Sequence, residues 1–103
     1  MENVENKKSA DLAAVKAKVI RVNGETEPVE PENGMDFQLD EVKRLISCEW
    51  IEVVRLADGK LMVMDEEGKL LRKRCNLKAS EIYNHPYDVI VGDVLVCNAD
   101  QLR

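Results

Sequence analysis

The chain has 103 residues, of which 45% are apolar and 34% are charged, a balance typical of one globular domain with a single core. Its formal net charge of −5 opposes non-specific attraction to nucleic acids and to anionic membrane surfaces. The three cysteines lie far apart and form no CxxC motif, so their spacing supports neither a disulfide framework nor a zinc site.

Residues 1–17 are expected to form an N-terminal extension. Residues 1–8 are polar and charged, and Ser9 is a suitable N-cap for a short helix over residues 9–16. The extension lacks the apolar segment of a secretory signal, and the longest apolar runs of the chain are too short to cross a bilayer. The sequence therefore predicts a soluble, cytoplasmic protein with reduced thiols and no membrane partner.

A first hairpin is predicted directly after the extension. Residues 18–22 have strand composition, and Asn23-Gly24 follows them as a turn signal. Residues 27–30 are the expected second arm. Because proline cannot donate to a sheet ladder, Pro28 in this arm and Pro31 just after it suit an edge strand or an extended loop.

The main helix is predicted over residues 36–48. Its apolar residues recur at helical spacing, and they are Leu39, Val42, Leu45 and Ile46. Asp36 is the expected N-cap. A glycine is expected at the end of such a helix, where Cys48-Glu49 stands instead.

The strongest local signal is a hairpin over residues 50–65. Asp58-Gly59 separates two apolar runs and predicts the two-residue turn of a type I′ hairpin. Both arms are apolar on both faces, so we expect this hairpin to lie at the centre of the sheet. Counting outward from the turn places Glu52 directly opposite Asp65.

The last part of the chain predicts a short helix and two strand segments. Asn76 is a suitable N-cap for a helix over residues 76–83, which must end before Pro86 because the residue before a proline avoids the α region. Residues 88–91 and 94–97 have strand composition.

These elements predict a single small α+β domain over residues 18–97. Its mainly antiparallel, twisted sheet is built around the central hairpin, with one main helix and one short helix packed on it. Residues 98–103 are expected to form a C-terminal tail.

Several short motifs follow one another between residues 18 and 97, with the main helix in its place. They are Ile51-Glu52-Val53-Val54, Asp58-Gly59, Glu66-Glu67-Gly68-Lys69-Leu70, Asn76 with Ala79, and the run of residues 88–96. This succession resembles domain-of-unknown-function family 3846. The resemblance implies a small α+β domain found mainly in bacteria, phages and conjugative elements, without an established biochemical activity.

The expected hairpin register produces one candidate metal site. Glu52 and Asp65 would face each other, with Asp93 as a third carboxylate. Paired carboxylates can bind a divalent cation or perform acid–base chemistry, because crowding raises one pKa and oxygen ligands suit hard metals. The alternative is that the hairpin frays before Glu52 and leaves solvated carboxylates, since like charges directly opposite each other destabilise a sheet.

One dense positive run is a candidate nucleic-acid site. Its residues are Lys69, Arg72, Lys73, Arg74 and Lys78. Phosphate binding needs such local charge whatever the net charge of the domain. No helix-turn-helix, RNP motif or glycine-rich phosphate loop accompanies the run, so an ordinary solvated connection is the competing interpretation.

No catalytic residues and no cofactor are predicted. His85, the one histidine, precedes a proline in an irregular loop without a nucleophile–base pair, and Cys97 lies within an apolar strand and is expected in the core. The hypothesis that fits best is a non-enzymatic binding or accessory module of a phage or conjugative element, acting on an unidentified protein partner. A nucleic-acid-associated module is the first alternative, and a metal-dependent enzyme is the second.

Overall fold

The computed structural model describes residues 16–102, so the helix expected over residues 9–16 falls almost entirely outside the described part. Five strands and two α-helices follow in the order β1 (Lys18–Ile20), β2 (Thr26–Pro28), α2 (Leu39–Ile46), β3 (Ile51–Arg55), β4 (Leu61–Asp65), α3 (Leu77–Tyr83) and β5 (Val94–Cys97), with a final 3-10 turn η1 (Ala99–Gln101). The strands form one open sheet in the order β2-β1-β5-β4-β3, in which all neighbours are antiparallel. The predicted α+β class is confirmed.

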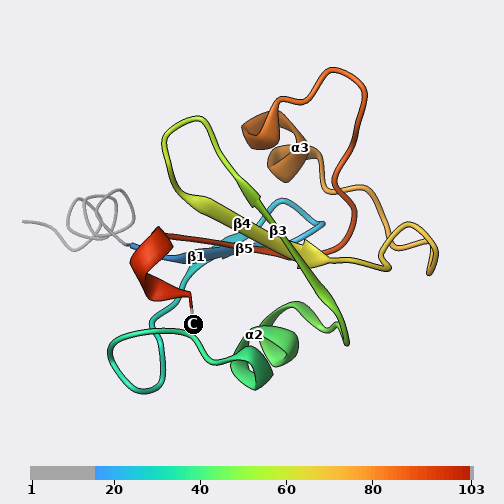
Figure 1. Cartoon of the computed structure of the whole chain (residues 1–103). Coiled ribbons are helices and arrows are strands. Elements are labelled where there is room, and N and C mark those ends of the chain that lie inside the picture. Colours follow the sequence, from blue (N-terminus) through green and yellow to red (C-terminus); the bar gives the residue numbers. More distant parts are fainter. Residues whose placement is uncertain (1–15, 103) are drawn as a thin grey trace, which may run out of the picture.

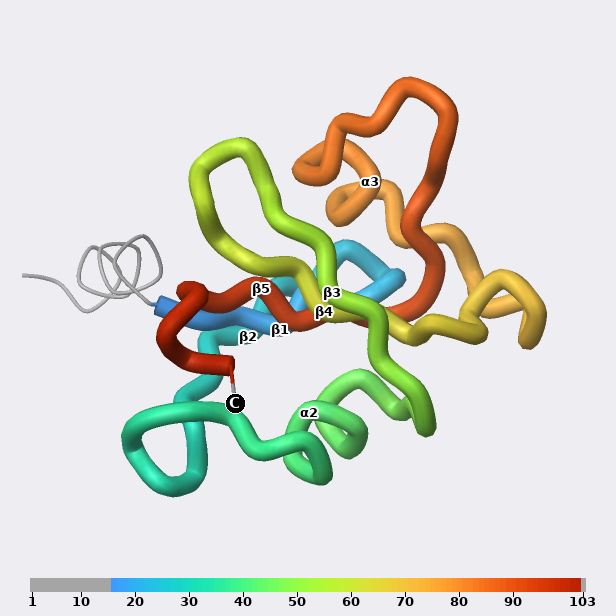
Figure 2. The backbone as a smooth tube through the Cα atoms, viewed as in Figure 1, coloured from blue at the N-terminus to red at the C-terminus, as the bar shows by residue number. Residues whose placement is uncertain are grey.

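The two helices cover opposite faces of the sheet, which gives the domain three layers (Figure 1; Figure 2). Alternation along the strands divides the core accordingly, because successive side chains point to opposite faces. The buried residues of the α2 side are Ala17, Val19, Phe37, Val42, Ile46, Val63, Leu95 and Cys97. Those of the α3 side are Ile20, Leu56, Met62, Met64, Ala79, Ile90, Val94 and Val96.

The centre of the sheet is β5, and the prediction of a central hairpin is wrong. All four residues of β5 are buried, with Leu95 and Cys97 on the α2 side and Val94 and Val96 on the α3 side. In the expected hairpin only β4 is buried in this way, whereas β3 forms the edge of the sheet. The pattern of apolar residues on both faces therefore predicted the position of β4 correctly, as an inner strand, but predicted that of β3 wrongly.

The hairpin turn also differs from the prediction. Leu56 N–H donates to the carbonyl of Lys60 at 2.8 Å, and Gly59 N–H donates to the carbonyl of Leu56 at 2.9 Å, which closes a three-residue loop. Gly59 has a φ of +90°, but Asp58 is not among the residues with positive φ, as a type I′ turn would require. Asp58 instead accepts a hydrogen bond from Lys60 N–H through Oδ1 at 3.0 Å.

The extra loop residue shifts the pairing of β3 and β4 by one position. Glu52 lies opposite Met64, and Asp65 lies opposite Ile51. Because a shift by one residue moves a side chain to the other face of a sheet, Glu52 and Asp65 point to opposite faces. The predicted Glu52–Asp65 pair does not form.

The main helix is shorter than expected and is capped differently. Its N-cap is Gln38 rather than Asp36, and the Glu41 carboxylate accepts hydrogen bonds from the backbone N–H groups of Gln38 (3.4 Å) and Glu32 (2.9 Å). The helix ends at Ser47, which adopts the left-handed conformation (φ 56°) that usually selects glycine.

The short helix α3 begins as predicted, with Asn76 as its N-cap. The Oδ1 atom of Asn76 accepts a hydrogen bond from Ala79 N–H at 3.0 Å. Its Nδ2 donates to the carbonyls of Ile20 (3.0 Å) and Gly92 (2.9 Å), so this fully buried amide also ties the helix to β1 and to the turn before β5. Asn84, with φ 54°, ends the helix before Pro86.

The segments at the two ends of the described chain pack into the domain. β1 and β2 form the predicted first hairpin, with Pro28 at the edge of the sheet. Residues 98–102, expected to be a tail, include η1 and a parallel bridge between Leu102 and Phe37. Residues 88–91, expected to be a strand, make one isolated bridge, from Val91 to Cys75.

Candidate functional site

The basic run does not form a uniform positive patch. Lys69 is ion-paired with Asp88, and Lys73 Nζ lies 2.7 Å from Asp65 Oδ2 while donating to the Ser47 carbonyl at 2.6 Å. The remaining cations of the run are exposed and, within residues 16–102, form no ion pair: they are Arg72, Arg74 and Lys78. Three of the five predicted residues are therefore available to a phosphate.

The three predicted metal ligands do not come together. Asp65 is buried against Lys73, Asp93 Oδ2 lies 2.9 Å from Arg21 Nη1, and Glu52 is exposed on the α3 side of β3. Among residues 16–102, no group of three histidine, cysteine or acidic side chains is arranged to hold a metal ion. The predicted metal site depended on the predicted hairpin register, and that prediction is wrong.

Ion pairing shifts the pKa values of two charged residues, Arg21 and Asp88. The pKa of Arg21 is raised, first by its hydrogen bonds to Glu27 and then by its hydrogen bond to Asp93. The pKa of Asp88 is lowered, chiefly because Lys69 donates a hydrogen bond to it. Both shifts stabilise the ordinary charged form of the group, so neither residue is prepared to exchange a proton near neutral pH.

The cysteines and the histidine show no catalytic arrangement. Burial raises the pKa of Cys48, and it raises that of Cys97, which lies in the core as predicted, to about 11. Both thiols are therefore held in the unreactive neutral form. His85 lies on an exposed loop, stacked on Tyr83 at 5.4 Å and edge-on to Tyr87 at 6.4 Å.

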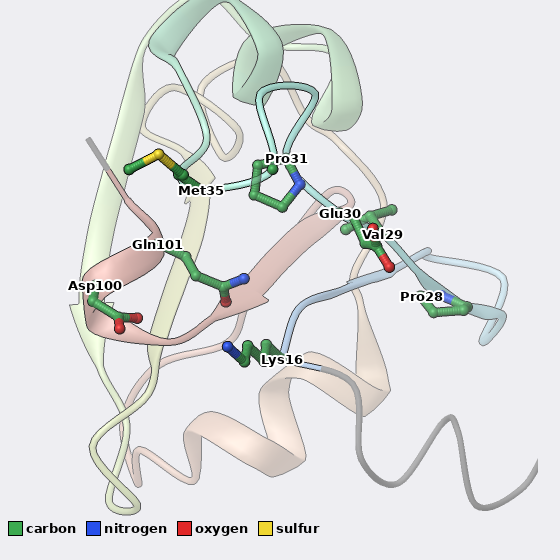
Figure 3. A pocket seen from close by; sticks show the side chains of 9 residues that line it. Lys16, Pro28, Val29, Glu30, Pro31, Met35, Asp100 and Gln101 are labelled. Atoms are coloured by element: carbon green, nitrogen blue, oxygen red, sulfur yellow. The ribbon is translucent and has the colours of Figure 1, made fainter.

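One hollow lies beside β2 and η1 and has a volume of about 680 Å³. Its side chains come from Lys16, two residues before β1, from the end of β2 and the loop after it, and from η1, and they surround an open space (Figure 3). The lining residues are Lys16, Pro28, Val29, Glu30, Pro31, Gly34, Met35, Asp100 and Gln101. They include no serine, cysteine or histidine, so this hollow offers no nucleophile–base pair.

The free edge of β3 is the candidate site that the sequence did not reveal. Within the described residues no strand pairs with β3 on the side away from β4. Two large apolar residues are exposed along it: Val53 in the strand, at 41%, and Trp50 just before it, at 58%. Lys43 of α2 lies over the Trp50 ring, with Nζ 5.6 Å from the ring centre. The site therefore combines unpaired backbone with exposed apolar surface, both of which favour protein contacts.

A sequence signal for this edge exists in the composition of the two arms. β3 reads Ile-Glu-Val-Val-Arg and carries two charges, whereas β4 reads Leu-Met-Val-Met-Asp and is charged only at its end. Charged side chains within a strand are a common feature of sheet edges. The Glu52 and Arg55 positions could thus have identified β3 as the edge strand.

Comparison with known proteins gives a family but no activity. Neither α2 nor α3 has the length and apolar character needed to cross a membrane. No curated protein and no solved structure matches the chain. A family model described as a domain of unknown function (DUF3846) matches residues 16–102, which is nearly the whole chain. The protein therefore belongs to the DUF3846 family.

Proposed function

We propose that this protein is a non-enzymatic binding or accessory module that holds a protein partner by strand addition to β3. The single observation that carries the proposal is the unpaired β3 edge with exposed Val53 and Trp50 beside it. An extended segment of a partner can add to such an edge through main-chain hydrogen bonds, while pockets for alternate side chains supply specificity.

The biological setting of the proposal is the cytoplasm of a bacterium that carries a phage or conjugative element. It is supported by the resemblance of the motif order to a family of that setting. The absence of a converging catalytic or metal-ligating group among the described residues favours binding over catalysis.

Site-specific crosslinking in the native host tests the proposal. A photo-crosslinking amino acid at Val53 is expected to capture a protein partner reproducibly, because this residue lies in the middle of the free edge. The same group at Glu27, on the opposite edge strand, is the matched control and should capture none. Capture that is absent at Val53, or equal at both positions, would overturn the proposal.

The alternative function is a nucleic-acid-associated module, and the observation that favours it is the exposure of Arg72, Arg74 and Lys78. Such binding must weaken as salt rises, because each phosphate contact releases counterions. A gel-shift assay at low salt would support it if the shift is lost in a variant in which all three cations are replaced by glutamate. No shift of the wild-type protein at low salt would remove the alternative.

A further inference from the structure

The backbone groups that β3 leaves free can be identified from its hydrogen bonds to β4. Glu66 N–H donates to the carbonyl of Trp50 at 2.8 Å at one end of the hairpin, and Leu56 N–H donates to that of Lys60 at 2.8 Å at the other. In an antiparallel pair, residues that bond across alternate with residues that do not. The even-numbered residues of β3 therefore face β4. Ile51, Val53 and Arg55 direct their N–H and C=O groups outward.

The side chains of the edge are divided between the two faces of the sheet. Val53 lies opposite Val63, so it shares the α2 side, where its exposed methyl groups stand near the edge. Glu52 lies opposite Met64 on the α3 side. At the middle of the edge, an added strand would therefore meet the apolar Val53 on the α2 side and the acidic Glu52 on the α3 side.

A second carboxylate strengthens the acidic character of the α3 side. Glu52 and Glu66 line one small hollow together with Asp88, and Asp88 is neutralised by its ion pair with Lys69. Glu52 and Glu66 are both exposed, and neither has an ion pair within residues 16–102. The free charge beside the edge on this side is therefore negative.

We propose, on the basis of the proposed function, that the β3 edge binds an extended partner segment in which apolar residues alternate with lysine or arginine. The segment runs antiparallel to β3, the commoner arrangement in sheets. Its apolar side chains lie on the α2 side beside Val53, and its cationic side chains lie on the α3 side beside Glu52 and Glu66. Opposite charges across neighbouring strands stabilise this register.

Charge favours a foreign segment over a second copy of this chain. Two β3 strands paired about Val53 would place Glu52 of each copy diagonal to Glu52 of the other, at about 7–8 Å between Cα atoms. No cation of the opposing strand would lie beside either carboxylate, because Arg55 belongs to the other face. Both copies would also carry a net charge of −5.

Synthetic peptides test the proposed partner chemistry directly. The probe is Lys-Val-Lys-Val-Lys-Val-Lys, and its binding is followed by the fluorescence of Trp50, the one tryptophan of the chain. The control peptide has glutamate in place of each lysine. We expect the lysine peptide to bind and the glutamate peptide to bind at least about tenfold more weakly at low salt, since the local charge is reversed.

N-methylation of the peptide separates strand addition from charge attraction. In the proposed register the valines lie opposite the outward-facing residues of β3, so their N–H groups donate to β3. Methylating the valine nitrogens should abolish binding, whereas methylating the lysine nitrogens, which point away, should preserve it. Equal binding of the two methylated peptides would overturn the proposal.

Matched variants of the protein locate the charge contact. Glu52→Lys should weaken binding of the lysine peptide about three- to tenfold at low salt. Glu25→Lys changes the net charge equally but lies in the exposed turn between β1 and β2, so it should leave binding unchanged. Equal effects of the two variants would show that net charge, and not the edge, attracts the peptide.

Two further outcomes are decisive. Efficient disulfide crosslinking between two copies of a Val53→Cys variant, abolished by Arg55→Pro, which removes an outward-facing N–H, would identify a second copy as the occupant and overturn the proposal. If the lysine peptide fails to bind while the photo-crosslinker at Val53 still captures a partner, the proposed function stands and only the partner chemistry is wrong.

Discussion

β2 and β3 are both edge strands of the sheet, yet β2 has three residues and ends in a proline, whereas β3 has five residues and no proline. β2 also carries Glu27, which forms an ion pair with Arg21 at 3.0 Å. The β3 edge carries exposed Val53 and adjoins exposed Trp50. Short length, proline and surface charge are the usual protections of a sheet edge against unwanted pairing. β2 has all three, whereas β3 has only the charged residues Glu52 and Arg55, which indicates that β3 is the edge more open to a partner.

The two edges also differ in the burial of the ion pairs that support them. The Arg21–Glu27 pair is partly solvated, with 26% and 47% of the side chains exposed. The Lys73–Asp65 pair, at the end of β4 next to β3, leaves only 2% of the Asp65 side chain exposed. A solvated pair contributes little to stability, whereas removing one partner of a buried pair leaves an uncompensated charge. Breaking the ion pair next to β3 should therefore cost more stability than breaking the ion pair next to β2.

Removal of Lys73, the cation paired with buried Asp65, is expected to have the largest effect. Lys73→Met should lower the free energy of unfolding by about 3–5 kcal/mol, because Asp65 Oδ2 has no hydrogen bond within the described residues and depends on Lys73 alone. Chemical denaturation near neutral pH measures this loss. Glu27→Gln, at the other edge, is the matched control and should cost less than about 1 kcal/mol. Similar losses in the two variants would contradict the contrast between the edges.

Cys97, in the central strand β5, should make the free energy of unfolding depend on pH, with an effect of intermediate size. Burial raises the pKa of Cys97 to about 11, so the folded state retains the thiol proton that the unfolded chain loses near its ordinary pKa of 9.0. Stability is therefore fully present below pH 9 and falls as the pH rises toward 11, by about 2–3 kcal/mol in all, because one pKa unit corresponds to ~1.4 kcal/mol.

The Cys97→Ala variant isolates this contribution from that of other groups that titrate at high pH. Unfolding is measured for both proteins at pH 8 and at pH 10.5, and the variant should lose less stability between the two than the wild type. An identical loss in the two proteins would show that the Cys97 thiol does not cause the pH dependence.

A pair of valines gives the smallest and most direct comparison of the edge with the interior. Val53 and Val63 lie directly opposite each other on β3 and β4, but Val63 is fully buried and Val53 is 41% exposed. Val63→Ala should cost about 2 kcal/mol, from the lost methyl groups and the cavity they leave. Val53→Ala should cost less than about 1 kcal/mol. Thermal or denaturant unfolding measures both, and equal costs would mean that β3 is more enclosed than its exposure indicates.

The sequence by itself determined the local elements of this protein. Helical spacing of apolar residues predicted α2, and an asparagine before Leu77 predicted the start of α3, because a cap is satisfied by neighbours three residues away. Turn signals at Asn23-Gly24 and Asp58-Gly59 predicted two hairpins that are both present. The burial of Cys97 followed from its place in an apolar strand.

Only the tertiary structure decided the order of the strands and the candidate site. Asp58-Gly59 is compatible with both a two-residue and a three-residue loop, and the choice fixes which residues of β3 join the core. β5 lies between β1 and β4, a contact between segments far apart in sequence that no local pattern specifies. The folding of the chain around the sheet also gave Lys69 and Lys73 their acidic partners and placed β3 at the edge. Capping and turns depend on neighbouring residues, whereas the edge and its charges depend on packing across the whole domain.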